Sequence, residues 1–311
     1  MKKTTAGAAK SATKKTAPAK PAVKKSAAKK ITPAKAAVKK ATPATASPKK
    51  TASARSDISG LRKTPAPPAI RIPDVPKEAT ADNFVKAMQP YISPTERDKL
   101  MRYFKQDEGD QFIGIRMGQL FALAKAFIAM PPAELDKLLQ SPVHEVRAGA
   151  LSIMDKQGRN NKTPESRRKE LYDLYLKRHD RINNWDLVDL AAQFVIGRYL
   201  FDKPRAVLAK LAKSKNEWER RTAITATAYF IRQGEVEDTF RIAAMLAHDR
   251  HDLVQKAVGG WIREAGKSRH RQELLLFLDQ YAATMPRTAL RYAIEHLGEK
   301  ERKHYMGLKE K

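Results

Sequence analysis

Trp185 and Asp189 are the residues whose types and spacing best suit chemistry in this sequence. They are four residues apart, so on a helix they lie on one face and can act on one ligand. Asn183 or Asn184 would cap this helix, and Asp186 in its first turn is explained by the helix dipole. Asp189 lies a turn deeper in an apolar run, where a carboxylate is costly to desolvate unless a cation meets it. The pair suggests a catalytic site; the alternative is an ordinary acid near a helix start beside a half-buried tryptophan.

A second helical segment pairs an aromatic residue with a cation. Trp218 and Arg221 are three residues apart and share a face, and Arg221 opens an apolar run that continues to Ile231. An arginine in that position must either extend its side chain to solvent or meet an anion. We expect both residues to contribute to binding an anionic polymer, with a structural ion pair of Arg221 as the alternative.

A basic surface is predicted from cations that recur at helical spacing. The candidates are Lys256, Arg263 and Lys267 on one stripe, and Arg287 and Arg291 near the C-terminus. Such a stripe could follow a phosphate backbone, where phosphate contacts position a protein; a solvated basic face is the alternative. Gly259 and Gly260 interrupt the stripe inside a helical pattern and indicate a close backbone approach rather than a cofactor loop.

The 311 residues carry a formal charge of +27 that is unevenly distributed. Residues 1–72 hold 19 Lys and Arg against one acid, or +18, and the other 239 residues hold +9 (27 − 18). We interpret residues 1–80, rich in Lys, Ala and Pro, as a disordered tail and linker that binds DNA by releasing counterions. The alternatives are a solubilising tail and a generic binder of anionic surfaces. The chain has no cysteine, which excludes disulfides and thiolate metal sites.

Residues 81–311 are predicted to form one helical domain. Helical periodicity and start signals such as Ser93-Pro94-Thr95-Glu96 predict an all-α fold, a HEAT-like α-solenoid of helix pairs, with an irregular bundle as the alternative. The expected helices cover 82–89, 94–106, 117–130, 132–140, 144–156, 165–178, 185–200, 204–213, 217–233, 236–247, 251–266, 270–283 and 286–298. The concave face of a solenoid could hold an extended polymer.

Several short motifs in this domain, in order, resemble those of the AlkD-like DNA alkylation repair family, the HEAT-like repeat alkylpurine DNA glycosylases. They are Phe112-Ile113-Gly114-Ile115-Arg116, His144-Glu145-Val146-Arg147, Trp185-Asp186-Leu187-Val188-Asp189, Trp218-Glu219-Arg220-Arg221, Val254-Gln255-Lys256-Ala257-Val258-Gly259 with Arg263-Glu264, and Met285-Pro286-Arg287-Thr288-Ala289-Leu290.

The resemblance implies roles for individual residues. Asp189 would be the catalytic carboxylate, Trp185 its aromatic partner and Arg221 a residue near the DNA backbone. Where the family usually has a second cleft tryptophan, this chain has Gly260. Trp261 follows one residue later, about 100° around the helix, and is a further candidate for DNA binding. A proline and an arginine of the family pattern are also replaced, by Gly118 and Phe121.

The function implied is hydrolysis of the N-glycosidic bond of cationic N3- or N7-alkylated purines in duplex DNA. Family members are thought to act without drawing the base into a deep pocket. We expect no metal and no cofactor, double-stranded DNA with alkylated bases as the partner, no membrane, a monomer, and a cytoplasmic location at the nucleoid, or nuclear in a eukaryote. The alternatives are a non-catalytic HEAT-repeat DNA-binding protein, for damaged, branched or chromatin-like DNA, and a helical protein scaffold.

Overall fold

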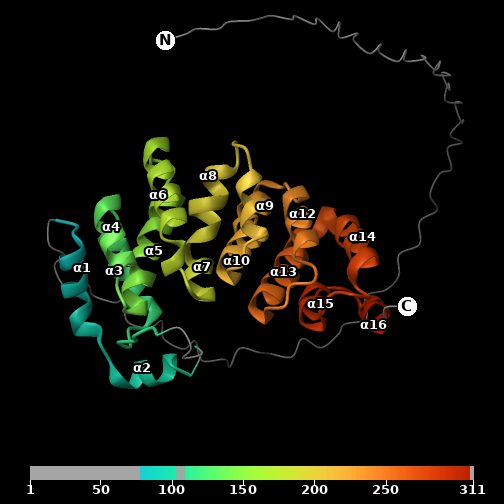
Figure 1. The fold of residues 1–311 in the computed structure, drawn as a ribbon, viewed down its shortest axis with the longest axis horizontal. Coiled ribbons are helices and arrows are strands. Elements are labelled where there is room, and N and C mark those ends of the chain that lie inside the picture. The colour runs from blue at the N-terminus through green and yellow to red at the C-terminus, as the bar shows by residue number, and fades with distance from the viewer. Residues whose placement is uncertain (1–77, 103, 105–108, 309–311) are drawn as a thin grey trace, which may run out of the picture. The chain divides into compact units, whose positions relative to one another are not determined.

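The computed structural model describes residues 78–102, 104 and 109–308, all within one compact unit, Ala66–Lys311. The prediction of a disordered basic tail falls on residues outside this description. Figure 1 shows the described part as a row of helices. None of these helices has the length and apolarity needed to cross a membrane.

The helices confirm the predicted all-α fold. They are α1 Ala81–Met88, α2 Pro94–Leu100, α3 Met117–Ala126, α4 Pro132–Leu139, α5 His144–Arg159, α6 Glu165–Lys177, α7 Trp185–Ala191, α8 Arg198–Leu200, α9 Ala206–Ala212, α10 Glu217–Ala226, α11 Ala228–Gln233, α12 Glu237–Met245, α13 Asp252–Ala265, α14 Arg271–Tyr281, α15 Arg287–Ala293 and α16 Glu299–Gly307. No strand occurs among the described residues, and a single isolated bridge joins Gln111 to Val143.

The helices pack in two layers. In one layer α3, α5, α7, α10, α13 and α15 contact one another in that order; in the other, α4 contacts α6, which contacts α8, and α9 contacts α12, which contacts α14. Figure 1 shows the two layers side by side along the row. Pairs such as α4 with α5 and α12 with α13 join the layers, and the apolar core lies between them. Both predicted catalytic residues lie in the first layer.

Sequence signals located the helix starts well. The Ser93 side chain accepts a hydrogen bond from the backbone of Glu96 (3.4 Å), and Asn184 and Asn216 cap α7 and α10 in the same way. Helix α16 was not predicted, because its sequence is mostly charged and only Tyr305 of its residues is buried. Without an apolar stripe there is no periodicity to detect.

Two predicted helices are divided in the structure. The predicted helix 185–200 contains a π-helical segment, Ala192–Gly197, between α7 and α8. Gly197 lets this segment pack closely on α10, because a Cβ there would lie 2.1 Å from the carbonyl oxygen of Ala226. The predicted helix 217–233 is interrupted at Thr227, whose hydroxyl donates to the Ile224 carbonyl (2.7 Å). The π-helical turn directly follows the helix that carries Asp189. Such turns occur frequently at functional sites.

Candidate functional site

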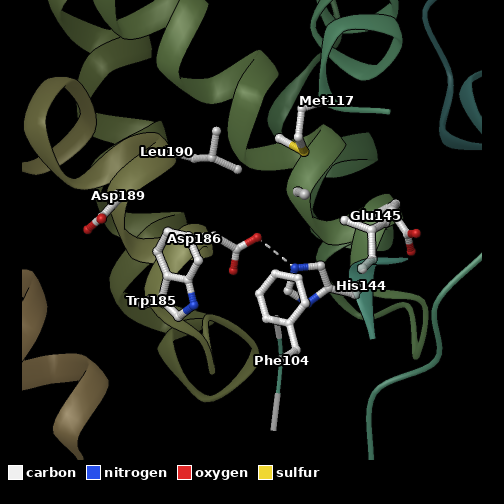
Figure 2. Close-up of a pocket in the computed structure, with 10 residues that line it drawn as sticks. Phe104, Met117, His144, Glu145, Trp185, Asp186, Asp189 and Leu190 are labelled. Carbon is white, nitrogen blue, oxygen red and sulfur yellow. Dashed lines mark hydrogen bonds and ion pairs between the residues drawn. The ribbon is translucent and has the colours of Figure 1, made fainter. Parts of the chain in front are cut away.

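Helix α7 presents Trp185 and Asp189 on one face, as their spacing predicted. The side-chain oxygen of Asn184 accepts from the Trp185 amide (2.8 Å), so the helix begins at the tryptophan. Both residues line the same two cavities, one on each side of α7. Figure 2 shows Asp189 and Asp186 pointing in different directions from this helix, with Asp186 directed at His144. The two carboxylates therefore belong to different environments.

Arg221 of α10 is the cation that meets Asp189. Its Nε lies 3.1 Å from Oδ1 of the carboxylate and one terminal nitrogen lies 2.6 Å from Oδ2, a two-pronged pair that fixes the carboxylate plane. Arg221 also donates to the carbonyl of Leu253 in the first turn of α13. The arginine side chain is 9% exposed, whereas that of Asp189 is 39% exposed. A buried arginine thus holds a carboxylate that still faces solvent.

The environment of Asp189 acts on its ionisation in two directions. Burial of part of the carboxyl group raises its pKa, Arg221 lowers it, and the charge of Asp186 raises it again; the net direction is upward. Because part of the side chain is exposed and both oxygens accept from Arg221, the charged form retains solvent and a cation as partners.

A basic cleft lies between α7, α10, α13 and α15. It has a volume of about 600 Å³ and is lined by Trp185, Asp189, Arg221, Leu253, Lys256, Ala257, Gly260, Trp261, Arg263, Glu264 and Tyr292. Lys256 pairs with Asp252 (3.1 Å), and Arg263 pairs with Glu264 (3.4 Å) and with Glu295. The structure therefore gathers six of the predicted site residues around one cleft, in which Arg221, Lys256 and Arg263 are each paired with a carboxylate.

The remaining predicted DNA-binding residues lie elsewhere. Trp218 is 6% exposed and its ring packs edge-on against His251, with centroids 5.5 Å apart, so the expectation that it contacts DNA is not supported. The Trp218 ring packs in the core. The sequence pattern alone could not distinguish a buried tryptophan from an exposed one. Lys267 lies beyond the end of α13, where it pairs with Glu264 (2.6 Å). Arg287 and Arg291 are exposed on α15 but outside the cleft lining.

The two adjacent glycines of α13, Gly259 and Gly260, lie in different surroundings. A Cβ on Gly259 would lie 2.2 Å from the carbonyl oxygen of Ala289, so the predicted close backbone approach holds there and allows α13 to pack on α15. A Cβ on Gly260 would meet nothing within 4 Å, because this glycine faces the open cleft. The prediction of close approach is therefore wrong for Gly260. Trp261 lines the cleft beside it and donates from its indole nitrogen to the Thr225 hydroxyl (3.3 Å).

The second cavity lies on the other side of α7, next to α5. It has a volume of about 380 Å³ and is lined by Leu100, Phe104, Met117, His144, Glu145, Ala148, Trp185, Asp186, Asp189 and Leu190. Figure 2 shows Phe104 over His144 and beside Trp185. The Phe104 ring is nearly parallel to the Trp185 ring, with centroids 6.0 Å apart and planes 22° apart. One side of Trp185 is therefore backed by another aromatic ring.

A buried polar cluster, which we call the α5 hub, holds the start of α7. It consists of His144, Arg147, Asp110 and Asp186. His144 lies 2.8 Å from Asp186 and 3.1 Å from Asp110, one carboxylate at each ring nitrogen. Burial opposes the charge on His144, but these two carboxylates outweigh it and raise the pKa of the imidazole to about 9. The histidine is therefore a cation at neutral pH, and the helix-dipole explanation of Asp186 was incomplete.

Arg147 completes the hub from one turn further along α5. It is fully buried and donates to Asp110 (2.5 Å), to the side-chain oxygen of Asn183 (3.0 Å) and to the carbonyl of Ser141 (2.9 Å). Sequence reasoning noted His144 and Arg147 only within a family motif. The sequence did contain a signal for the hub: a histidine and an arginine lie three residues apart on one helix. When such a helix is buried, its charged side chains need anions as partners.

Comparison with known proteins places this geometry in a family. The chain matches the DNA alkylation repair enzyme family over residues 84–297. It is also similar to the structure of a predicted DNA alkylation repair enzyme from Enterococcus faecalis, with 17% sequence identity and a TM-score of 0.54, over 67% of this chain and 97% of that one. No curated protein matches the chain. The α5 hub and the basic cleft lie within the matched residues, and the chain belongs to the DNA alkylation repair enzyme family.

Proposed function

We propose that this member of the family is a DNA glycosylase that hydrolyses the N-glycosidic bond of cationic N3- and N7-alkylated purines in duplex DNA. The observation that carries the proposal is the Asp189 carboxylate, held by two hydrogen bonds from the buried Arg221 and 39% exposed beside Trp185 in a basic cleft. A carboxylate in this setting is fixed in orientation before any substrate binds.

The chemistry follows from the charge of the substrate. A purine alkylated at N3 or N7 is already positively charged and leaves without strong protonation. Positive charge then develops on the deoxyribose, as in the oxocarbenium-like transition state of glycoside hydrolysis. Asp189 would stabilise that charge and orient the attacking water, and the π face of Trp185 would contact the same cation.

The surroundings of Asp189 support a role for its charged form. Arg221 keeps both carboxylate oxygens hydrogen-bonded, and the exposed edge leaves one side for the sugar or a water molecule. Lys256 and Arg263 line the same cleft, where they can exchange their surface carboxylate partners for phosphates.

The test is single-turnover release of base from duplex DNA that contains N7-methylguanine. Asp189→Asn keeps the shape of the side chain but removes its charge, so we expect release to fall by about 10²- to 10³-fold, the usual loss for one electrostatic contact in a transition state. DNA binding should persist. Equal release by the variant and the wild type would contradict the assignment.

A non-catalytic DNA-binding protein is the second candidate. The observation in its favour is the Arg221–Asp189 pair itself, because a two-pronged ion pair between α7 and α10 also joins two helices structurally. Tight binding without release, from duplexes with either N7-methylguanine or N3-methyladenine, would favour this candidate over the glycosylase.

A further inference from the structure

Two arginines from different helices converge on the ring of Phe194 in the π-helical segment. The guanidinium carbon of Arg159, the last residue of α5, lies 4.0 Å from the ring centroid, and that of Arg232, in the last turn of α11, lies 5.6 Å from it. Both distances are within the roughly 6 Å of a cation–π contact. The Arg159 side chain is 50% exposed, and Arg232 is exposed as well. We call Arg159, Phe194 and Arg232 the arginine platform, because the ring holds two guanidinium groups in place and leaves their charge open to solvent.

The platform carries more positive charge than its surroundings neutralise. Arg198 donates to two carbonyls at the C-terminal end of α5 (both 2.8 Å), and Lys156 lies three residues before Arg159 on that helix. The carboxylate among these cations is Asp155, which pairs with Arg159 (2.6 Å). Among the described residues, Lys156, Arg198 and Arg232 have no carboxylate partner. Four cations against one acid leave a local charge of +3 (4 − 1).

The helix dipole gives a structural reason for only part of this cluster. Cations near a helix C-terminus offset the dipole, and Arg198 does so directly through the two α5 carbonyls. Arg232 makes no hydrogen bond to any described residue and instead lies exposed over the Phe194 ring. Its guanidinium donors therefore remain available to an anion.

The platform lies on the same face of the first layer as the two cavities of the candidate site. On α5, Glu145 and Ala148 line the smaller cavity, and a spacing of three or four residues carries this face through Ser152 and Asp155 to Arg159. Arg159 is 14 residues beyond Glu145 (159 − 145), or about 21 Å along the helix.

The neighbouring pair of helices, α10 and α11, gives the same result. Arg221 lines the basic cleft, and Arg232 is 11 residues further on (232 − 221), close to three helical turns, so both lie on one face. Thr227 between the two helices keeps helical dihedral angles (φ −65°, ψ −15°), so this face continues into α11. The separation is about 17 Å. The cleft and the arginine platform are therefore opposite ends of one surface.

A DNA duplex presents two phosphate backbones to such a surface. Grooves of about 6 and 12 Å separate them, and long side chains at both ends shorten the span of about 17–21 Å between backbone positions of the protein. We propose that the arginine platform binds phosphates of the undamaged strand while the damaged strand lies at Asp189. The position of the damaged strand rests on the proposed function. The arrangement fits a base that stays in the duplex, because both strands then remain paired on the protein.

The chemistry of the platform favours a nucleic-acid strand. Guanidinium groups suit phosphates, because their planar fork of N–H donors matches two oxygens. An acidic protein would be attracted by the same charge. The shared helix face favours DNA, since one duplex can contact the cleft and the platform together. Holding both backbones would fix which side of the damaged nucleotide faces Asp189.

The test maps phosphate contacts with the full-length protein. The probe is a duplex with one 3-deaza-3-methyladenine, whose uncharged base is a poor leaving group. Single phosphates of either strand are replaced in turn by neutral methylphosphonates, and the dissociation constant is measured for each duplex. We expect at least one position in the undamaged strand where the replacement weakens wild-type binding by about ten-fold, the scale of one charge-assisted hydrogen bond.

The platform variants should lose this sensitivity. R159M/R232M already lacks the contact, so the same replacement should no longer change its affinity, and its slope of log K against log salt should fall by about two. R232M alone leaves the pair of Arg159 with Asp155 intact and should show about half of the slope change. The matched control, R167M/R241M, removes two arginines from α6 and α12, each paired with a carboxylate, and should keep the wild-type pattern of sensitive phosphates.

Far-UV circular dichroism checks that the variants are folded; if R159M/R232M is not, R232M decides alone. A wild type insensitive to every replacement in the undamaged strand would overturn the proposal. So would unchanged sensitivity in the platform variants, which would leave an acidic protein as the occupant, or an equal loss of the pattern in R167M/R241M.

Only binding is measured, so failure of this proposal is distinguishable from failure of the proposed function. Loss of phosphate sensitivity in the platform variants, with no wild-type release of base from N7-methylguanine, would reject only the glycosylase. Release of the base with no sensitive phosphate in the undamaged strand would reject only the arginine platform as a DNA contact.

Discussion

The α5 hub and the basic cleft are both built from carboxylates and cations, yet they use them differently. In the hub, Asp110 and Asp186 are held by His144 and Arg147, which are 3% and 0% exposed. In the cleft, the cation Arg221 is also largely buried, with 9% of its side chain exposed, but its carboxylate partner Asp189 keeps 39% of its side chain exposed. The hub therefore joins segments of the chain, and the cleft leaves its anion available to a ligand.

This difference explains why Asp186 and Asp189, three residues apart on α7, have different roles. Asp186 turns towards α5, where a buried cation binds it and fixes the start of the helix. Asp189 turns towards α10 and is positioned by Arg221 without being covered. Removing a hub residue should affect stability first, and removing a cleft residue should affect activity first.

The largest expected effect is the loss of Arg147. In Arg147→Met the carboxylate of Asp110 loses its closest cation inside the protein, and breaking a buried pair in this way costs about 3–5 kcal/mol. Urea denaturation measures the change in the free energy of unfolding. Arg178→Met is the matched control, because Arg178 pairs with Asp136 at the surface and should cost much less. Similar losses in the two variants would show that the hub is no more important to the fold than a surface pair.

The charge on His144 should make stability depend on pH. Its folded pKa of about 9 lies above the unfolded value of 6.5, so folding gains free energy below pH 6.5 and loses that gain as pH rises through 9. Between pH 7 and pH 10 the loss should be on the order of 2–3 kcal/mol, from about 1.4 kcal/mol per unit. Urea denaturation across this range should show the decline in the wild type and a flatter profile in His144→Gln. Parallel profiles would mean that the histidine is not the titrating group.

Loss of Arg221 should affect excision more than stability. In Arg221→Gln the carboxylate of Asp189 loses its cation, its pKa rises further, and less of it is charged. We expect single-turnover excision to fall by about 10- to 100-fold at neutral pH, with its acid limb displaced to higher pH. Arg220→Gln is the control, because the neighbouring Arg220 makes the same two-pronged pair with a different carboxylate, Asp249 (2.6 and 3.2 Å). If the two variants lost activity equally, the loss would report helix packing and not the cleft.

The smallest expected effect concerns a cation of the cleft rim. Lys256→Ala should weaken duplex binding for all sequences alike and reduce the slope of log K against log salt by about one, as expected for one phosphate contact. The control is Lys169→Ala, which removes a comparable i,i+4 pair with Asp173 on α6. An unchanged slope in Lys256→Ala would place the DNA backbone elsewhere on the molecule.

The sequence predicted most of the helices because their information is local. Apolar periodicity and caps such as Ser93 and Asn184 act within a few residues, and they located nearly every described helix to within a few positions at its start. The helix α16 was missed because it lacks an apolar stripe. The sequence also did not show the π-helical turn, whose Gly197 packs closely against the Ala226 carbonyl of another helix. Prediction of a helix therefore failed where the local sequence carried no apolar periodicity.

For the candidate site too, the sequence predicted some features and could not predict others. The spacing of Trp185 and Asp189 was enough to place them on one helix face, and the apolar residues around Asp189 were enough to predict a cation beside it. Residue type could not show that Trp218 is buried while Tyr292 is exposed, since both are aromatic residues within helical patterns. Exposure depends on which helix packs against a given face.

By itself, the sequence determined the helices, the charge and the residues able to do chemistry. Only the tertiary structure decided their partners: Arg221 for Asp189, His144 for Asp186, and open space for Gly260 beside the closed contact of Gly259. The physical reason is range. Helix propensity and capping act over one or two turns, whereas ion pairing, desolvation and cleft volume arise between side chains that are tens of residues apart along the chain and meet only when the helices pack.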